Sequence, residues 1–215
     1  MVKHQNDHIE TLTEIRSLME RSSRFISLSG LSGVAAGLVA LAGAAVAYVY
    51  FGLPLFSGKN EHYYEVIRNG KWGMDYVTFF LLDAGLVFVL ALAGGIFFTT
   101  RKARKKGQKI WDPLVQRMIA NLAIPLVAGG IFCIALFKNG AYGLIAPATL
   151  IFYGLALVNG GKYTLNDIRY LGIFEILLGF IGLFQPGYGL ELWALGFGLA
   201  HIVYGLAMWY KYERL

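Results

Sequence analysis

Six long apolar stretches constrain this chain more than any other feature of its sequence. A helix needs roughly 20 apolar residues to cross a hydrocarbon layer about 30 Å thick. The stretches cover residues 25–51, 76–100, 114–137, 141–158, 168–184 and 190–210, and the fourth and fifth are the shortest. Charged residues make up only 15% of the chain, against roughly a quarter in soluble proteins. The sequence therefore predicts an all-α, polytopic membrane protein with a six-helix transmembrane domain over residues 25–210.

The distribution of basic residues predicts the orientation of these helices. If the N-terminus is cytoplasmic, 15 of the 19 Lys and Arg residues lie in cytoplasmic segments, as the positive-inside rule requires. With six spans, residues 211–215 then form a cytoplasmic tail. The same rule accounts for the net charge of +6, so we expect no nucleic-acid partner. We predict a multi-pass protein of the cell membrane, most simply a bacterial plasma (inner) membrane.

Residues 1–24 precede the first apolar stretch and carry an amphipathic pattern. Apolar residues at positions 9, 12, 15, 18 and 19 recur at helical spacing. One interpretation is a cytoplasmic helix that lies on the membrane surface. The other is a docking helix over residues 8–24 for a cytosolic protein or a second copy of the chain. The length of this segment and its acidic residues argue against a cleaved signal peptide.

Short repeats predict that the helices form duplicated hairpins. The motif Tyr-Gly-Leu-Ala occurs at 153–156 and again at 204–207, each time followed by a Lys-Tyr pair. Arg117 and Arg169 mark the cytoplasmic starts of the third and fifth stretches. Hairpins that all enter from one side are related by an axis along the membrane normal.

The last hairpin carries a resemblance to a known family. Its Gly-rich run from Leu171 to Gly179, the Gln-Pro turn at 185–186 and the later Gly198 and Gly205 resemble the repeat of the HdeD family of acid-resistance membrane proteins. The resemblance covers roughly residues 117–210, and the first hairpin departs from it in its long outer loop. It implies a six-helix bundle and a stress-related role, and it brings no catalytic residues.

Glycines in the first stretch predict close helix packing. Gly30, Gly33 and Gly37 lie on one helical face and include a Gly-x-x-x-Gly pattern, which lets two helices approach closely. We expect this face to pack against another helix and to favour a homo-oligomer.

Polar residues inside the stretches are the candidate site residues, because ionisable groups in hydrocarbon are costly and are usually retained for function. Glu175, His201, Asp83 and Asn121 are the candidates. In an antiparallel hairpin, Glu175 and His201 approach within one or two helical turns. Such a pair suits proton uptake and release near neutral pH, or it forms a neutral structural pair. Asp83 has Arg68 and Lys71 as possible partners, or it acts alone in an outward-facing cavity.

An enzyme must also be considered. Gly30-Leu-Ser32-Gly33 resembles the Gly-x-Ser-Gly motif of rhomboid proteases, and Ala200-His201 resembles their Ala-His. The other rhomboid motifs do not accompany them, and a nucleophile and its base are defined by geometry rather than by a short string. The single cysteine, Cys133, excludes a thiolate metal cluster. We expect no cofactor and no metal.

The leading functional prediction is a non-enzymatic membrane protein of envelope stress response or of small-solute and proton handling. The alternative is a membrane anchor or sensor that recruits a cytosolic partner through its N-terminal helix. An intramembrane serine protease that uses Ser32 and His201 is a remote third.

Overall fold

The computed structural model describes residues 28–52, 69–107 and 110–214, and all its regular elements are helices. Five helical stretches are long and apolar enough to cross a membrane: α2 (Gly30–Phe51), α4 (Tyr76–Lys105), α5 (Pro113–Lys138), Tyr142–Tyr163 around α6 (Ile145–Gly160), and Gly189–Tyr212. The last of these joins α8 (Gly189–Trp193), a π-helical segment (Ala194–Ala200) and α9 (His201–Tyr212).

A further helix, α7 (Asn166–Phe184), has 19 residues and also carries Asp167, Arg169 and Glu175. The prediction of an all-helical membrane protein is confirmed at the level of helix length and composition. The predicted helix over residues 1–24 lies outside the described residues.

Local sequence signals fix where the helices begin and end. Asp75 caps α4 by accepting hydrogen bonds from the backbone N–H groups of Val77 and Thr78. Asp112 caps α5 in the same way, and Pro113 follows at the first helical position, where its missing N–H is not needed. At the end of α2, Gly52 adopts the left-handed conformation with φ of 62°, which glycine tolerates without strain.

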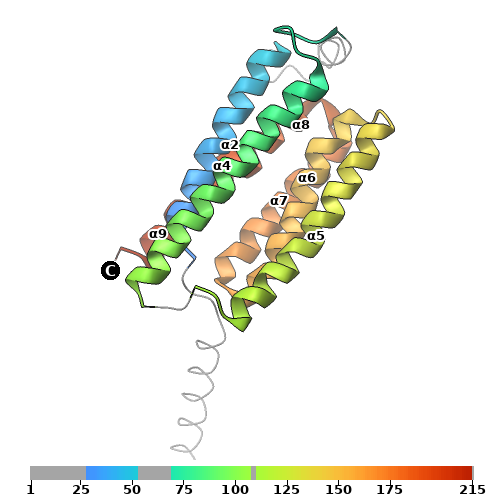
Figure 1. The fold of residues 1–215 in the computed structure, drawn as a ribbon. Helices are drawn as coiled ribbons and strands as arrows, with labels where there is room; N and C mark the ends of the chain where they lie inside the picture. The colour runs from blue at the N-terminus through green and yellow to red at the C-terminus, as the bar shows by residue number, and fades with distance from the viewer. Residues whose placement is uncertain (1–27, 53–68, 108–109, 215) are drawn as a thin grey trace, which may run out of the picture.

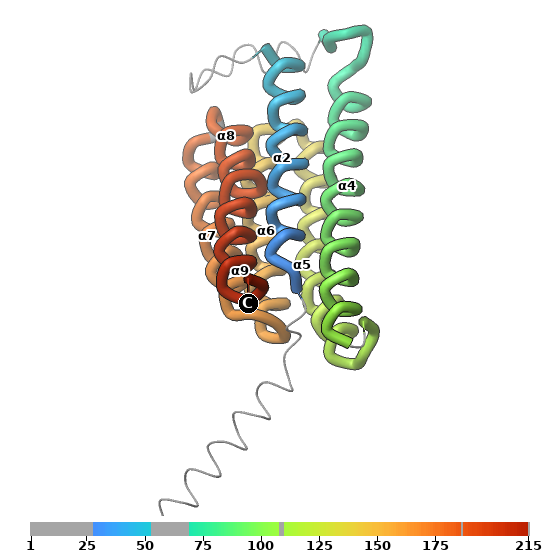
Figure 2. Tube along the Cα trace, turned by 90° about the vertical axis from the view of Figure 1, so that its left-hand side faces the viewer, coloured from blue at the N-terminus to red at the C-terminus, as the bar shows by residue number. Residues whose placement is uncertain are grey.

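The helices form an incomplete ring (Figures 1 and 2). We call the continuous helix made of α8, the π-helical segment and α9 the rod. Around the ring, each helix contacts the next in the order α4, α2, the rod, α7, α6 and α5. Helix α4 packs against α2, α5 packs against α6, and α4 and α5 make no comparable contact with each other. Within the described residues, the ring is therefore open along the seam between α4 and α5.

Two seams of the ring are closed through glycines. A Cβ atom on Gly154 of α6 would lie 2.5 Å from the carbonyl oxygen of Gly172 on α7. A Cβ atom on Gly30 of α2 would lie 2.3 Å from the carbonyl oxygen of Gly205 on α9. Both distances are shorter than real Cβ contacts, so these backbones approach each other only because the residues are glycines.

The predicted glycine face of α2 packs within the chain. Gly33 lies against Gly205 and His201 of α9, and Gly37 lies against Gly198 of the π-helical segment. These three glycines of α2 are therefore occupied by the chain's own rod, and a homo-oligomer would need another surface.

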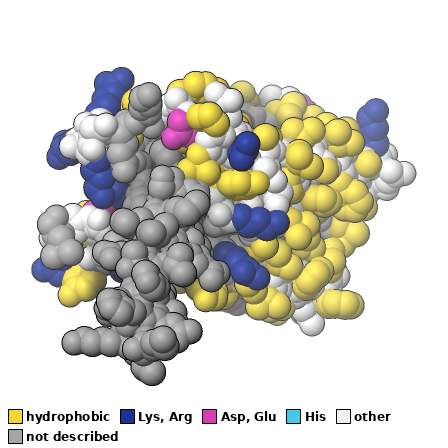
Figure 3. Space-filling model, turned by 90° about the horizontal axis from the view of Figure 1, so that it is seen from below, with side chains coloured by type: hydrophobic (Ala, Val, Ile, Leu, Met, Phe, Trp, Pro, Cys, Tyr) yellow, Lys and Arg dark blue, Asp and Glu magenta, His cyan; other side chains and the backbone are white. Residues whose placement is uncertain are grey.

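The outer surface of the bundle is apolar. Phe184 is 83% exposed, and Ile124 and Leu81 are exposed by 68% and 67%. Such a surface is expected where lipid replaces water around the helices. Helices α4 and α9 finish at one end of the bundle, and α5 and α7 begin at the same end. We call this the basic end. Figure 3 looks onto this end and shows Lys and Arg side chains there, with hydrophobic side chains along the flank.

Candidate functional site

The structure brings Glu175 of α7 and His201 of α9 together, as the sequence predicted. Glu175 is fully buried and His201 is buried. The Nδ1 atom of His201 lies 3.4 Å from Oε1 of Glu175. The two residues come from neighbouring elements of the ring, so helix packing fixes their separation.

Tyr153 of α6 completes this group, and sequence reasoning missed it. Its hydroxyl lies 2.8 Å from Nε2 of His201, and Nδ1 of His201 lies 2.9 Å from the carbonyl oxygen of Gly196. A carbonyl oxygen only accepts, so in the neutral ring Nδ1 carries the proton and the Tyr153 hydroxyl donates to Nε2. Tyr153 belongs to the repeated Tyr-Gly-Leu-Ala motif, which was the available signal.

The backbone of the rod is shaped to admit the Glu175 carboxyl group. The rod is π-helical over Ala194–Ala200, a wider turn that occurs often at functional sites. A Cβ atom on Gly196 would lie 2.3 Å from Oε2 of Glu175. Glycine at this position therefore leaves the space that the carboxyl group occupies, and the glycine-rich run 196–198 was its only sequence signal.

The surroundings of the Glu175 carboxyl group are unusually poor in donors. Neither of its oxygens has a hydrogen-bond partner among the described residues. A buried polar group without partners is costly, and an isolated buried charge is far more so. His201 is the ionisable group that faces it. The pair is electrically neutral both as acid with imidazole and as carboxylate with imidazolium, and these two forms differ only in the position of one proton.

A cavity of about 1170 Å³ occupies the centre of the ring. Tyr153, Phe197 and His201 contribute to its wall, whereas Glu175 does not. The rings of Phe197 and His201 stack with centroids 5.9 Å apart, and Trp193 lies 4.9 Å from Phe197. Tyr153 and His201 therefore lie between the buried acid and the cavity.

The other predicted polar residues lie apart from this group. Asp83 of α4 lines the cavity, and no described residue forms an ion pair with it. Its possible partner Lys71 donates to the carbonyl oxygen of Val49 instead, and Arg68 lies outside the described residues. Asn121 donates to the Tyr163 hydroxyl at 3.3 Å and joins α5 to the end of α6.

Ser32 and His201 have separate partners. The Ser32 hydroxyl donates to the carbonyl oxygen of Ser29 in its own helix, while both ring nitrogens of His201 face Gly196 and Tyr153. The geometry does not present a serine hydroxyl to an imidazole base. Among the described residues, no group of three or more His, Cys, Asp or Glu side chains could hold a metal ion.

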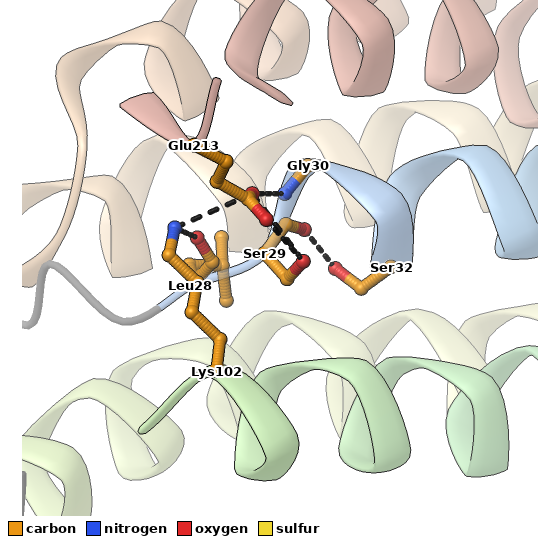
Figure 4. Close-up of polar contacts among 6 residues, drawn as sticks. All are labelled: Leu28, Ser29, Gly30, Ser32, Lys102 and Glu213. Carbon is orange, nitrogen blue, oxygen red and sulfur yellow. Dashed lines mark hydrogen bonds and ion pairs between the residues drawn. The ribbon is translucent and has the colours of Figure 1, made fainter. Parts of the chain in front are cut away.

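A second polar cluster connects three segments of the chain at the basic end (Figure 4). The ammonium of Lys102, near the end of α4, lies 3.3 Å from Oε1 of Glu213 and donates to the carbonyl oxygen of Leu28. Glu213 also accepts hydrogen bonds from the Ser29 hydroxyl and the Gly30 backbone N–H. We call this the Lys102–Glu213 cluster. It ties the end of α4 to the start of α2 and to the residues that follow α9.

Comparison with known proteins leaves the function open. No family model, no curated protein and no solved structure matches this chain. The fold and the site define a class, a helical membrane protein with a buried acid–imidazole pair, and the resemblance to the HdeD family stays a prediction.

Proposed function

We propose that this chain is a non-enzymatic membrane protein that handles protons, alone or together with a small solute, through Glu175, His201 and Tyr153. One observation carries the proposal: a fully buried carboxyl group, to which no described residue donates a hydrogen bond, lies 3.4 Å from a buried imidazole. Such a pair is expensive inside a membrane protein, and residues of this kind commonly form proton relays there.

The hydrogen bonds suggest the order of the groups. Tyr153 and His201 both line the cavity, and the Tyr153 hydroxyl lies 2.8 Å from Nε2 of His201. A proton that approaches from the side of Tyr153 is taken up at Nε2 of His201, and the Nδ1 proton then passes to Glu175. Tyr153 sets the orientation of the ring, because its hydroxyl and the Gly196 carbonyl hold both ring nitrogens.

This proposal keeps the chain within the classes expected from its sequence, envelope stress response or small-solute and proton handling, in a bacterial plasma membrane. Acid exposure is the stress to which a proton-binding pair would respond. The pair has no part in bond cleavage in this scheme.

The experiment is proton binding and proton flux of the full chain in proteoliposomes. Difference infrared spectroscopy should show a carboxyl band that changes with pH in the wild-type protein and disappears in Glu175→Gln. A pH-sensitive dye inside the vesicles should report slower proton movement in Glu175→Gln and in His201→Ala. Tyr153→Phe should shift the pH dependence of the carboxyl band and leave the band present.

Asp83→Asn provides the matched control, because Asp83 is an acid of the cavity wall outside the pair. It should leave the pH-dependent band of Glu175 in place. A band and a flux that survive Glu175→Gln and are lost in Asp83→Asn would move the site to Asp83. A wild-type protein that neither binds nor moves protons would refute the proposal.

A further inference from the structure

The central cavity runs along the bundle from one end to the other. Its wall includes Leu28 and Trp111 at the basic end, and Phe51 and Tyr142 at the opposite end. Helices α4 and α5 both contribute to the wall but do not pack against each other. The seam between α4 and α5 is therefore the side at which neighbouring helices do not close the cavity.

The helices beside this seam are the most exposed of the bundle. In an apolar segment of 18 residues, only 6% of the residues are buried in α4 and in α5. The corresponding share is 39% in α2 and 44% in the stretch around α6. Several side chains of α4 and α5 that line the cavity are exposed, including Leu92, Ile96, Ile119 and Leu126. In a membrane, such a surface is in contact with acyl chains, because no water is present to cover it.

The size and chemistry of the cavity favour an acyl chain over a polar solute. Its volume of about 1170 Å³ exceeds the roughly 300–1000 Å³ of common small-molecule pockets. Apolar side chains form most of the wall along its whole length. A long flexible hydrocarbon chain satisfies such a wall without leaving polar groups unpaired.

The basic end supplies the charge that a lipid headgroup would meet. Arg101, Arg104 and Lys105 are exposed in the last turns of α4, and Arg117 is exposed in the second turn of α5. Lys102 is buried and already contacts Glu213 and Leu28, so it is not part of this exposed set. Basic residues beside the ends of membrane helices attract anionic lipid.

We propose that the cavity binds a phospholipid with an anionic headgroup, whose acyl chain enters between α4 and α5 while its phosphate lies beside Arg101 and Arg104. This inference goes beyond the proton-handling site, because it concerns the α4–α5 seam and the exposed basic residues beside it, whereas Glu175, His201 and Tyr153 belong to α7, α9 and α6. Its tests leave Glu175 and His201 unchanged, so the two proposals can fail separately.

The first test compares two lipids with identical acyl chains. Native mass spectrometry of the full chain, extracted in mild detergent, would count bound phosphatidylglycerol and phosphatidylcholine. We expect phosphatidylglycerol to be retained preferentially. In the double variant Arg101→Gln/Arg104→Gln, this preference should fall by roughly tenfold, because each basic residue near the membrane surface adds to the attraction. Lys138→Gln/Arg169→Gln removes the same charge at positions away from Arg101 and Arg104, at the opposite end of α5 and on α7, and should keep the preference.

The second test fills the cavity. Gly95 of α4 and Gly130 of α5 line it, and a Cβ atom at either position would meet no heavy atom within 4 Å. Gly95→Trp and Gly130→Trp should therefore fold and should lose both lipids. Gly85 of α4 offers the matched control, since its Cβ would also meet nothing within 4 Å and it is not part of the cavity wall. Gly85→Trp should retain both lipids.

Several results would overturn the proposal. One is a wild-type protein that releases all lipid in detergent and whose masses are those of a lipid-free dimer, since a second copy would then cover the seam. Another is equal lipid retention in Gly85→Trp, Gly95→Trp and Gly130→Trp. A third is binding of glycerol phosphate as tight as that of phosphatidylglycerol, which would mean that the headgroup alone is recognised and the cavity plays no part.

Discussion

At the α6–α7 seam two apolar helices pack closely against each other, whereas at the α4–α5 seam two similarly apolar helices do not. Comparing the two seams shows what close packing requires. At the closed seam, Gly154 and Gly172 let two backbones meet. At the open seam, Gly95 and Gly130 have empty space where a side chain would be. Aligned on Arg117 and Arg169, the residue of α5 that corresponds to Gly172 is Ala120, which is exposed, whereas Gly172 is buried. Glycine marks a contact only where a second backbone is close enough to need it.

Bulk added at the two seams should have opposite consequences, and this is the largest effect we expect. Gly172→Leu places a Cβ atom 2.7 Å from the Gly154 carbonyl oxygen, so it should destabilise the protein by about 3 kcal/mol or prevent folding. Gly130→Leu should leave the thermal midpoint in detergent nearly unchanged. Equal destabilisation by the two variants would show that the seams do not differ as described.

The acid–imidazole pair lies on α7 and α9, away from the open seam. A methyl group added at Gly196 should disturb this pair. Gly196→Ala pushes a Cβ atom into Oε2 of Glu175 and should cost about 2 kcal/mol in unfolding free energy. Much of this loss should vanish in the Glu175→Ala background, which a double-mutant cycle measures as coupling. Gly189→Ala in the same rod, whose Cβ would have its nearest neighbour at 3.5 Å, should be close to neutral. Additive losses at positions 196 and 175 would contradict the packing.

Removing the Tyr153 hydroxyl tests whether Tyr153 belongs to the same site as His201 and Glu175. Tyr153→Phe removes the donor to Nε2 of His201, and leaving a buried acceptor unpaired costs about 1–2 kcal/mol. Tyr163→Phe provides the comparison, because its hydroxyl accepts a long bond of 3.3 Å from Asn121. Thermal unfolding in detergent should rank Tyr153→Phe below Tyr163→Phe. A larger loss of stability in Tyr163→Phe would show that the Tyr153 hydroxyl does not hold His201 as described.

The smallest effect concerns the start of α4, on the open side. Hydrogen bonds from the hydroxyl and backbone N–H of Thr78 hold the pKa of Asp75 below its usual value. A lowered folded-state pKa contributes stability above the unfolded-state pKa, and this contribution is lost as the pH falls through the folded-state value. The wild-type thermal midpoint should therefore decline slightly over this acidic range. Asp75→Asn keeps a capping oxygen without a charge and should lack that part of the decline; an identical decline would exclude Asp75 as its source.

The sequence predicted the helices well because hydropathy reports the environment that each segment tolerates. The apolar stretch 114–137 corresponds to α5 (Pro113–Lys138), and 76–100 corresponds to the apolar part of α4. It also predicted that Glu175 and His201 approach each other, since two polar residues on adjacent antiparallel helices have few other partners. Orientation in the membrane and the role of the N-terminal segment stay predictions.

Other features could not be predicted, because lipid-facing and helix-facing surfaces are equally apolar. Nothing in the composition of α4 and α5 distinguishes them from helices that pack together, so the open seam was not anticipated. Lys102 belongs to a run of basic residues whose other described members are exposed, and only the fold shows that Lys102 is buried beside Glu213. The role of Gly196 depends on a π-helical turn, which leaves no periodic pattern in so short a segment.

The wide turn at Ala194–Ala200 also sets the rotational phase of everything that follows it. Each residue of a regular α-helix advances the direction of its side chain by about 100°. If these seven residues formed ordinary α-helical turns, α9 would be rotated about its own axis relative to α8. His201 and Gly205 both belong to α9, so this rotation would turn His201 away from α6 and α7 and Gly205 away from α2 at the same time. One irregular turn thus sets the direction of both contacts that α9 makes with the rest of the bundle.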